Sequence, residues 1–327
     1  MKRRVTIIMY HFVRDLENSQ YPEIKGLTLS NFKEQIAYIK NYYTPVKMED
    51  LIEAVKSTDA ELPSNAVLLT FDDGYIDHFT NVFPVLDRYG IPGCFFPPAK
   101  AITEYRVLDV NKIHFILASV EDKTRIIRSI FADIEENQSE YALERPESYY
   151  EKLALPSRYD TAEVMFIKKI LQKALPEDLR ARMVDKLFAE FVTRDEAAFA
   201  KELYMSVEQL ECMQRNGMHI GSHGYDHYWL DSLSKNEQER EIRLSLEFLG
   251  RIGSNLDNWV MCYPYGAYNK SLHSILRENG CRIGLSTHVD VADLEHEDPL
   301  ALSRLDTNDL PKRKDAKPNE WTRKVIF

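Results

Sequence analysis

The sequence predicts an α/β protein built on a parallel sheet, and two features carry this prediction. Short apolar runs with strand character recur along the 327 residues, and helical patterns separate several of them. Alternation of this kind is typical of a parallel sheet, either open or closed into a barrel. In addition, Asp72 and Asp73 stand at the end of one apolar run, which is where α/β proteins usually carry their chemistry.

The expected strands cover residues 5–9, 67–71, 93–96, 219–221, 259–263 and 283–286. Helices are expected at 30–40, 48–56 and 237–251. Ser30 is a suitable N-cap for the first helix, and the helical period places Phe32, Ile36 and Ile39 on one face.

Residues 104–205 interrupt the alternation and predict a helical insertion between two parts of the main domain, 1–103 and 206–310. Residues 311–327 are expected to form a polar tail in which Trp321, Val325 and Ile326 are able to dock. Helices of the insertion are expected at 111–119, 123–137, 162–173, 176–192 and 194–200. The residues Tyr141, Tyr149, Tyr150 and Tyr159 fall between these helices, and we interpret them as packing residues, with a sugar-binding lid as the alternative.

The acidic pair follows a buried strand at 66–69 and precedes Gly74, which breaks the strand. Neighbouring carboxylates repel each other, so a partly buried pair needs a cation, a shared proton or water. The functional interpretation is that one acid binds a metal ion and the other handles a proton. For an isolated Asp-Asp-Gly, a solvated turn would be the better interpretation.

A histidine pair supports the functional interpretation. His223 and His227 are four residues apart, and Gly224 between them favours a turn. A tight turn or helix brings both imidazoles to one side, whereas a flat strand would separate them by about 13 Å. Two imidazoles and one carboxylate suit zinc or another first-row divalent metal.

A third segment, 260–269, is an apolar run that Pro264 and Gly266 end. Its aromatic rings could form the wall of a groove at a strand exit. By itself this segment predicts only a strand and a turn.

Taken together and in this order, the segments resemble the polysaccharide deacetylase family, also called the NodB-homology family or carbohydrate esterase family four. The similar motifs are TFDDG at 70–74, HGYDH at 223–227, YPYGAYN at 263–269 and MYH at 9–11, with further similarity over 29–51. The resemblance covers most of 1–103 and 205–310, and it implies an incomplete, deformed (β/α)7 barrel.

The resemblance also implies roles for individual residues. Asp73, His223 and His227 would bind the metal, and Asp72 would be the general base. The residues that would contact the substrate are His11, Tyr263, Pro264 and Tyr265, and a backbone N–H after Tyr263 would help to hold the oxyanion. The expected metal is Zn²⁺, with Co²⁺, Ni²⁺ or Mn²⁺ as alternatives.

The sequence departs from the family pattern at two catalytic positions. Cys262 stands where the family often has an arginine that contacts the base, and the late Leu-x-His-Asp motif of the general acid has no clear match. We expect Arg304 to replace the arginine, and His288 or His11 to replace the acid.

The expected activity is metal-dependent removal of an acetyl group from an N-acetylated sugar of a surface glycan or its precursor. The metal would polarise the carbonyl and acidify water, while Asp72 takes the proton and a histidine protonates the leaving nitrogen. An O-deacetylase, a small-molecule amidase and a glycan-binding relic without activity are the alternatives.

The net charge, the cysteines and the apolar runs indicate which partners and which cellular compartment to expect. The net charge of −10, without a long basic tract, argues against a nucleic-acid binder. Four widely spaced cysteines without a Cys-x-x-Cys pair predict reduced thiols. Because no apolar stretch reaches the roughly 20 residues of a membrane span, and the first apolar run is short for a signal peptide, we expect a cytoplasmic enzyme. The sequence does not indicate the oligomeric state.

Overall fold

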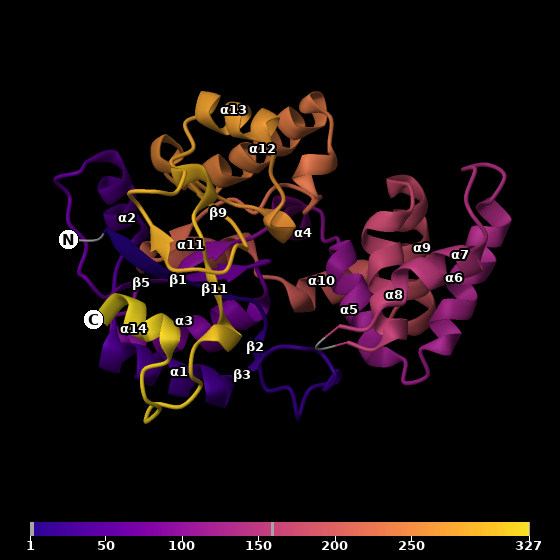
Figure 1. Ribbon diagram of the computed structural model, residues 1–327, viewed down its shortest axis with the longest axis horizontal. Helices are drawn as coiled ribbons and strands as arrows, with labels where there is room; N and C mark the ends of the chain where they lie inside the picture. Colours follow the sequence, from indigo (N-terminus) through magenta and orange to yellow (C-terminus); the bar gives the residue numbers. More distant parts are fainter. Residues whose placement is uncertain (1–2, 158–159, 327) are drawn as a thin grey trace. The chain divides into compact units, whose positions relative to one another are not determined.

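The computed structural model describes residues 3–157 and 160–326, which divide into two compact units. We call Met1–Asp15, Lys25–Tyr105 and Ala200–Phe327 the barrel unit, and Leu16–Ile24 with Arg106–Phe199 the helical unit. The strands belong to the barrel unit, and helix α10 continues from the helical unit into it (Figure 1).

The strands are β1 Arg4–Tyr10, β2 Val13–Arg14, β3 Leu27–Thr28, β4 Thr44–Pro45, β5 Ala66–Asp72, β6 Cys94–Phe96, β7 His219–Ile220, β8 Val260–Cys262, β9 Ile283–Leu285, β10 Ala292–Asp293 and β11 Leu305–Asp306. The helices of the barrel unit are α1 Leu29–Tyr42, α2 Met48–Lys56, α3 Phe83–Tyr89, α4 Ala99–Thr103, α11 Val207–Arg215, α12 Lys235–Arg251, α13 Lys270–Glu278 and α14 Glu320–Ile326. A π-helical segment, η1 His78–Val82, leads into α3. The remaining helices are α5 Asp109–Ser119, α6 Thr124–Asn137, α7 Pro146–Leu153, α8 Ala162–Lys169 with its π-helical extension η2 Ile170–Ala174, α9 Glu177–Phe191 and α10 Glu196–Leu203.

Parallel pairing organises the barrel unit around β5. Strand β5 pairs in parallel with β1 and β6, and β6 pairs in parallel with β7. Strands β8 and β9 form a separate parallel pair, which single bridges join to Ser222 after β7 and to Leu302 before β11. Strand β11 in turn pairs in parallel with β1. The pairings and bridges therefore run from β1 through β5, β6, β7, β8 and β9 back to β1, and they enclose an incomplete barrel. The predicted α/β fold of this type is confirmed.

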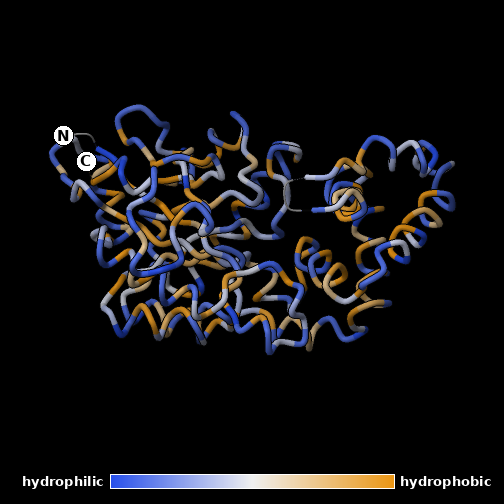
Figure 2. Tube along the Cα trace, turned by 60° about the horizontal axis from the view of Figure 1, so that its bottom comes forward, coloured by the Kyte–Doolittle hydropathy of each residue, from blue (hydrophilic) through white to orange (hydrophobic). Residues whose placement is uncertain are grey.

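Strand β5 is buried along its whole length, as expected for a strand covered on both faces. Rings from three neighbouring strands stack across it: Tyr10 on Phe71 at 4.9 Å, and Phe71 on Phe95 at 4.7 Å between centroids. Figure 2 shows hydrophobic segments running through the interior of the barrel unit. This packing fixes the position of the carboxyl end of β5, where the two aspartates lie.

Helix α1 confirms the predicted apolar face, because Phe32, Ile36 and Ile39 are buried. The predicted N-cap is wrong by two residues: Thr28 is the cap, and its hydroxyl accepts the N–H of Asn31. Ser30 lies in the first turn instead, where its hydroxyl contacts that of Thr28 at 3.1 Å.

The C-terminal segment is tied to α1 and to the residue that follows it, Tyr43. Helix α14 buries Thr322, whose hydroxyl lies 2.8 Å from the Tyr38 hydroxyl and 3.0 Å from that of Tyr43. Val325 is buried as well. The polar segment expected after 310 therefore ends in a docked helix.

The helical unit contains one helix that the sequence analysis did not predict. Tyr149 and Tyr150 lie inside α7, not between helices, and Tyr159 lies outside the described residues. In α7 only Pro146 is buried, so the segment lacks the apolar stripe by which a helix is recognised in a sequence. Pro146 occupies the first turn, where proline favours a helix start.

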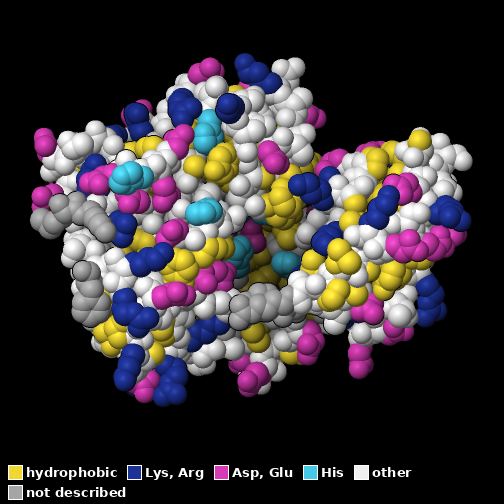
Figure 3. All heavy atoms as spheres, viewed as in Figure 1, with side chains coloured by type: hydrophobic (Ala, Val, Ile, Leu, Met, Phe, Trp, Pro, Cys, Tyr) yellow, Lys and Arg dark blue, Asp and Glu magenta, His cyan; other side chains and the backbone are white. Residues whose placement is uncertain are grey.

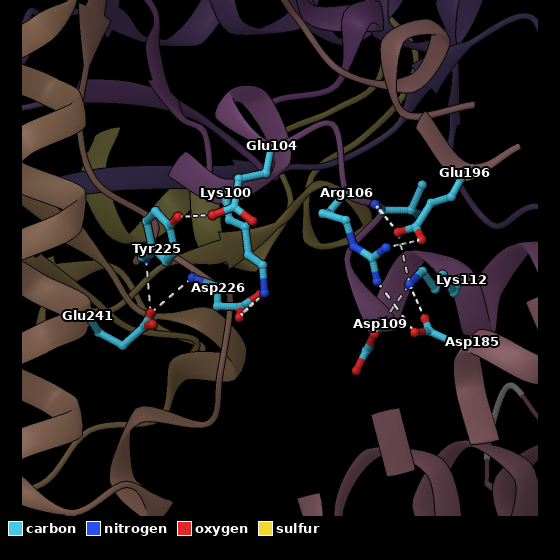
Figure 4. Close-up of polar contacts among 11 residues, drawn as sticks. Lys100, Glu104, Arg106, Asp109, Lys112, Asp185, Glu196, Tyr225, Asp226 and Glu241 are labelled. Carbon is cyan, nitrogen blue, oxygen red and sulfur yellow. Dashed lines mark hydrogen bonds and ion pairs between the residues drawn. The ribbon is translucent and has the colours of Figure 1, made fainter. Parts of the chain in front are cut away.

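A buried lysine joins three helices of the helical unit. Lys112 on α5 pairs with Asp185 on α9 and with Glu196 on α10, the latter at 3.0 Å (Figure 4). Arg106 pairs with the same two carboxylates, and the Glu196 carboxylate also accepts the N–H of Val107. Such a network fixes the relative positions of these helices within their unit.

The visible surface carries both signs of charge, with Lys and Arg side chains scattered among Asp and Glu (Figure 3). Within residues 3–157 and 160–326, no helix combines the length and the apolar character that a membrane crossing requires.

Candidate active site

The chain turns sharply after β5. Asp72 is the last residue of the strand and is 2% exposed, and Asp73 and Gly74 follow with φ of 70° and 69°. Aspartate is one of the few side chains that adopt this left-handed conformation readily. At Gly74 a side chain would also collide, because a Cβ there would lie 2.7 Å from the Cβ of Pro97. The turn therefore requires glycine and holds two successive carboxylates at the strand end.

The histidine pair lies on an irregular loop after β7. Ser222 bridges to Met261 of β8, and the loop then passes through Gly224 and His227, which have φ of 75° and 58°. These left-handed residues fold the loop back on itself, so that the rings of His223 and His227 lie 4.8 Å apart between centroids. The predicted tight turn, not a strand, explains how histidines four residues apart come together.

The structure brings Asp73 and both histidines together. The Oδ1 atom of Asp73 lies 3.4 Å from Nε2 of His223 and 3.3 Å from Nε2 of His227. Its other oxygen, Oδ2, accepts a hydrogen bond of 2.5 Å from the hydroxyl of Tyr75. All three residues are buried. Residues that are about 150 positions apart in the sequence thus converge at one point.

The hydrogen bond of His223 determines which of its nitrogens faces the carboxylate. Nδ1 lies 2.7 Å from the backbone oxygen of Cys262, which can only accept, so Nδ1 carries the proton. Nε2 is therefore the nitrogen that faces Asp73, and in the neutral imidazole its lone pair is available to a cation. A backbone carbonyl in this position is the usual support of a metal-binding histidine.

Protonation in this group is strongly coupled. Burial alone would raise the pKa of Asp73, but the contacts with His223 and His227 hold it well below its ordinary value. Burial lowers the pKa of His227. For His223, burial also lowers the pKa, but Cys262 and the Asp73 carboxylate raise it well above its ordinary value. A cation that entered the site would therefore displace a proton from His223.

These three residues fit a divalent metal ion. Their ligand atoms lie within 4.8 Å of one another. Among the described residues, Asp73 Oδ1 is buried and receives no hydrogen bond of ordinary geometry, which is unfavourable unless a cation occupies the space beside it. One carboxylate and two imidazoles leave coordination positions for water and substrate.

A second group of possible ligands, Asp72, His223 and Cys262, also lies within 4.8 Å. Burial raises the pKa of the Cys262 thiol, which keeps the sulfur protonated. The carboxylate of Asp72 is already engaged by Arg304. The group around Asp73 is therefore the better candidate for a cation.

The structure pairs Arg304 with Asp72. Arg304 is 1% exposed, and its two terminal nitrogens lie 3.0 and 2.9 Å from the two carboxylate oxygens. Its Nε donates to the Ser286 carbonyl, and Nη1 also donates to the hydroxyl of Thr70 on β5. Burial would raise the pKa of Asp72, but Arg304, His223 and His11 lower it to about 2. Asp72 is therefore ionised at neutral pH.

The two histidines considered as general acid lie in different surroundings. His11 is half-buried and acts electrostatically on Asp72, Asp73 and His227. Its backbone carbonyl accepts a hydrogen bond from the buried His78, whose Nε2 lies 2.9 Å away. His288 is exposed, and within the described part of the chain its ring hydrogen-bonds only to Ser303, at 3.0 Å.

The aromatic segment after β8 contributes one ring to the site. Tyr265 has φ of 57°, and its ring lies 4.8 Å from that of His227 and stacks on Trp229 at 4.3 Å. The expectation that Tyr263 lines a groove is wrong, because Tyr263 is fully buried and its hydroxyl donates to the Leu300 carbonyl at 2.7 Å. Pro264 is buried as well, so it shapes the turn without offering a surface.

Three residues near the site were missed in the sequence analysis: Tyr75, His78 and Trp229. Tyr75 could have been suspected because it lies two residues after Asp73. For His78 and Trp229 the sequence carries no signal, since their positions depend on contacts with His11 and Tyr265 that only the fold creates.

Comparisons with known proteins indicate the family of the chain. The profile of the polysaccharide deacetylase family matches residues 59–137 and 188–284, more than half of the chain. The poly-β-1,6-N-acetyl-D-glucosamine N-deacetylase of Escherichia coli strain K12 is 36% identical over 91 residues, which are 28% of this chain and 13% of that protein.

Two solved structures share the fold over the whole chain. The deacetylase PplD of Streptococcus pyogenes, solved in complex with acetate, has a TM-score of 0.59 at 16% identity, and the match covers 100% of both chains. IcaB of Ammonifex degensii has a TM-score of 0.55 at 18% identity, over 99% of this chain and 96% of that one. The chain belongs to the polysaccharide deacetylase family.

Proposed function

We propose that this protein removes the acetyl group from N-acetylated sugar units of a polysaccharide or of its precursor, with the help of a divalent metal ion. The observation that carries the proposal is the contact of Asp73 Oδ1 with both imidazoles, beside a second carboxylate that Arg304 engages. Two adjacent acids thus have different partners, which supports different roles for them.

Asp73, His223 and His227 would hold the metal. When bound, it would polarise the acetyl carbonyl and make a water molecule acidic enough to lose a proton near neutral pH. The buried surroundings of the three side chains strengthen this effect, because few water molecules compete for the cation.

Asp72 would accept the proton of the attacking water. Its low pKa keeps it ionised, and the two guanidinium contacts orient its carboxylate. The same low pKa makes Asp72 a weak base, so it suits a water molecule whose own acidity is raised. Arg304 therefore positions the base and does not touch the substrate.

His11 is the better candidate for the acid that protonates the leaving nitrogen. It directly follows Tyr10 of β1, which pairs with Phe71 of β5, so His11 leaves the sheet at the same end as Asp72 and Asp73. The hydrogen bond from His78 fixes the backbone of His11. The exposed ring of His288 has its hydrogen bond to Ser303 instead, which favours a structural role.

The stacked pair of Trp229 and Tyr265 supports a carbohydrate substrate. Their planes differ by only 2°, and Tyr265 also contacts the ring of His227. Flat aromatic surfaces beside a polar centre suit a sugar ring, which has apolar faces and polar edges.

The test is the release of acetate from β-1,6-linked N-acetylglucosamine oligomers by protein loaded with Zn²⁺ or Co²⁺. We expect release that a chelator stops and that added metal restores. Asp72→Asn should still bind one metal ion but lose turnover by about 100-fold or more. Activity that survives in Asp72→Asn, or that is unaffected by a chelator, would contradict the proposal. An O-acetylated oligomer of the same sugar separates N- from O-deacetylation.

We further propose that the reaction takes place in the cytoplasm, on a precursor of the glycan. The support is that Cys94, Cys212, Cys262 and Cys281 are all free thiols, as is usual in a reducing compartment. Fractionation of cells that express the tagged protein tests this, and recovery outside the cytoplasmic fraction would contradict it.

A further inference from the structure

Helix α12 carries an unusual stripe of buried polar residues. Gln238, Glu241 and Ser245 follow one another at spacings of three and four, which places them on one face, and each is at most 2% exposed. A helix normally buries apolar residues on its inner face. Buried polar side chains need partners, so this face must satisfy specific polar groups of its neighbours.

Glu241 and Ser245 of this stripe contact the loop that carries the two histidines, and Gln238 contacts residues beyond it. The carboxylate oxygen Oε2 of Glu241 accepts the N–H groups of Tyr225 and Asp226, both at 3.0 Å (Figure 4). The Ser245 hydroxyl lies 2.6 Å from that of Ser222, one residue before His223. Gln238 donates to the Leu230 carbonyl at 2.7 Å, beyond the far end of the loop.

Helix α4 satisfies the opposite set of backbone groups. The N–H of Ala99 donates to the Gly224 carbonyl at 3.2 Å, and that of Lys100 to the Tyr225 carbonyl at 2.9 Å. The side chain of Lys100 also forms an ion pair with Asp226 (Figure 4). The carbonyls of the turn between the histidines thus face α4, and its N–H groups face Glu241.

We propose that Glu241 is a positioning residue for the metal site: it holds the turn at 224–226 so that His223 and His227 face Asp73 before any cation binds. The inference rests on the proposed role of these three residues as metal ligands. Glu241 reaches neither the cation nor the substrate, because its contacts are to the backbone between the two histidines.

The strain in the loop gives the physical reason. His227 has φ of 58°, a conformation that is unfavourable for a side chain other than glycine and persists only where the surroundings enforce it. Two hydrogen bonds to one carboxylate oxygen, immediately before His227, supply such enforcement. Without them the turn would relax, and the imidazoles would separate from Asp73.

The deciding variants are Glu241→Gln and Glu241→Met, which have nearly the same length and volume. The amide oxygen of glutamine still accepts both N–H groups, whereas methionine cannot. Glu239→Gln is the matched control, because Glu239 lies on the same helix and, among the residues that the structure describes, forms its ion pair with exposed Lys235 alone. Thermal unfolding of the metal-free variants shows that each is folded.

The first measurement is metal affinity, from competition of Zn²⁺ between the metal-free protein and a chromophoric chelator. We expect binding that is about 10- to 100-fold weaker in Glu241→Met, less than about tenfold weaker in Glu241→Gln and unchanged in Glu239→Gln. The visible spectrum of bound Co²⁺ should change in Glu241→Met, because its ligand geometry changes. Equal affinities and spectra in all three variants and the wild type would overturn the inference.

The second measurement needs no variant. In the metal-free wild type, the amides of Tyr225 and Asp226 should be protected from hydrogen exchange, because Glu241 holds them without a cation. If they exchange as fast as an open loop and become protected only with Zn²⁺, the metal orders the turn and the inference is overturned. A wild type that binds no metal at all refutes the proposed function instead, so the two failures can be distinguished.

Discussion

Replacing Arg304 with methionine tests the electrostatics of the candidate base most directly. Methionine fills a similar volume but offers no charge and no donor, so the carboxylate of Asp72 would stay buried without its two guanidinium contacts. Removing one partner of a buried ion pair typically destabilises a protein by about 3–5 kcal/mol. The wild-type shift of Asp72, from 3.8 to a pKa of about 2, corresponds to about 2 kcal/mol, which agrees in order of magnitude.

The loss of stability in Arg304→Met should depend on pH, and the direction of this dependence follows from the pKa of Asp72. In the wild type the pKa of Asp72 is depressed, so its contribution to stability is present above 3.8 and is lost as the pH falls toward 2. In Arg304→Met the main remaining influence is burial, which raises the pKa. The ionised carboxylate then destabilises the fold at pH 7, and protonation relieves this as the pH falls toward 4.

The assay is urea unfolding of metal-free protein at pH 7 and pH 4. We expect the stability difference between wild type and Arg304→Met to be clearly larger at pH 7. The double variant Arg304→Met/Asp72→Asn should recover much of the loss at pH 7, because no buried charge is left. A difference that is the same at both pH values, or strictly additive effects of the two substitutions, would refute the reasoning.

Three further predictions concern other contacts. Tyr75→Phe removes the donor to Asp73 Oδ2 and should weaken Zn²⁺ binding by about tenfold in chelator competition; unchanged affinity would show that this hydrogen bond does not support the site. His11→Gln should lower kcat by about 100-fold or more, and His288→Gln by less than about threefold, in acetate release; the reverse order would reassign the acid. Lys112→Met should destabilise the protein by about 2 kcal/mol in urea unfolding, because Asp185 and Glu196 lose the buried one of the two cations that they share; wild-type stability would show that Lys112 contributes nothing to the network.

Local patterns were sufficient to predict the parts of the site that are continuous in the sequence. The apolar run before Asp72 predicted a buried strand, and β5 ends at that residue. The glycine between the two histidines predicted a turn, and the loop is folded back through left-handed residues. Helix α7 was missed because it lacks such a local pattern: a helix that buries only Pro146 has no apolar period to detect.

Contacts between distant segments could only be guessed. Arg304 was expected to replace the missing arginine, and it meets Asp72 across 232 residues, but nothing in the pattern around Arg304 distinguishes it from a surface arginine. Tyr263 was expected at the substrate and is buried, because consecutive side chains at the end of a strand point in opposite directions and the sequence does not say which points inward.

The sequence by itself determined the strands that lead into the site and the turns that follow them, since apolar runs, glycines and paired acids act over a few residues. The two-residue strands β2, β3, β4, β10 and β11 were not predicted. The order of the strands around β5 was decided by tertiary packing, and with it the meeting of Asp73 with His223 and His227, of Asp72 with Arg304, and of the histidine loop with helix α12. The physical reason is the distance over which each effect acts. Backbone preference and hydrophobic period act between residues close in sequence, whereas the neighbour of a side chain at the rim of a barrel depends on the packing of the whole barrel.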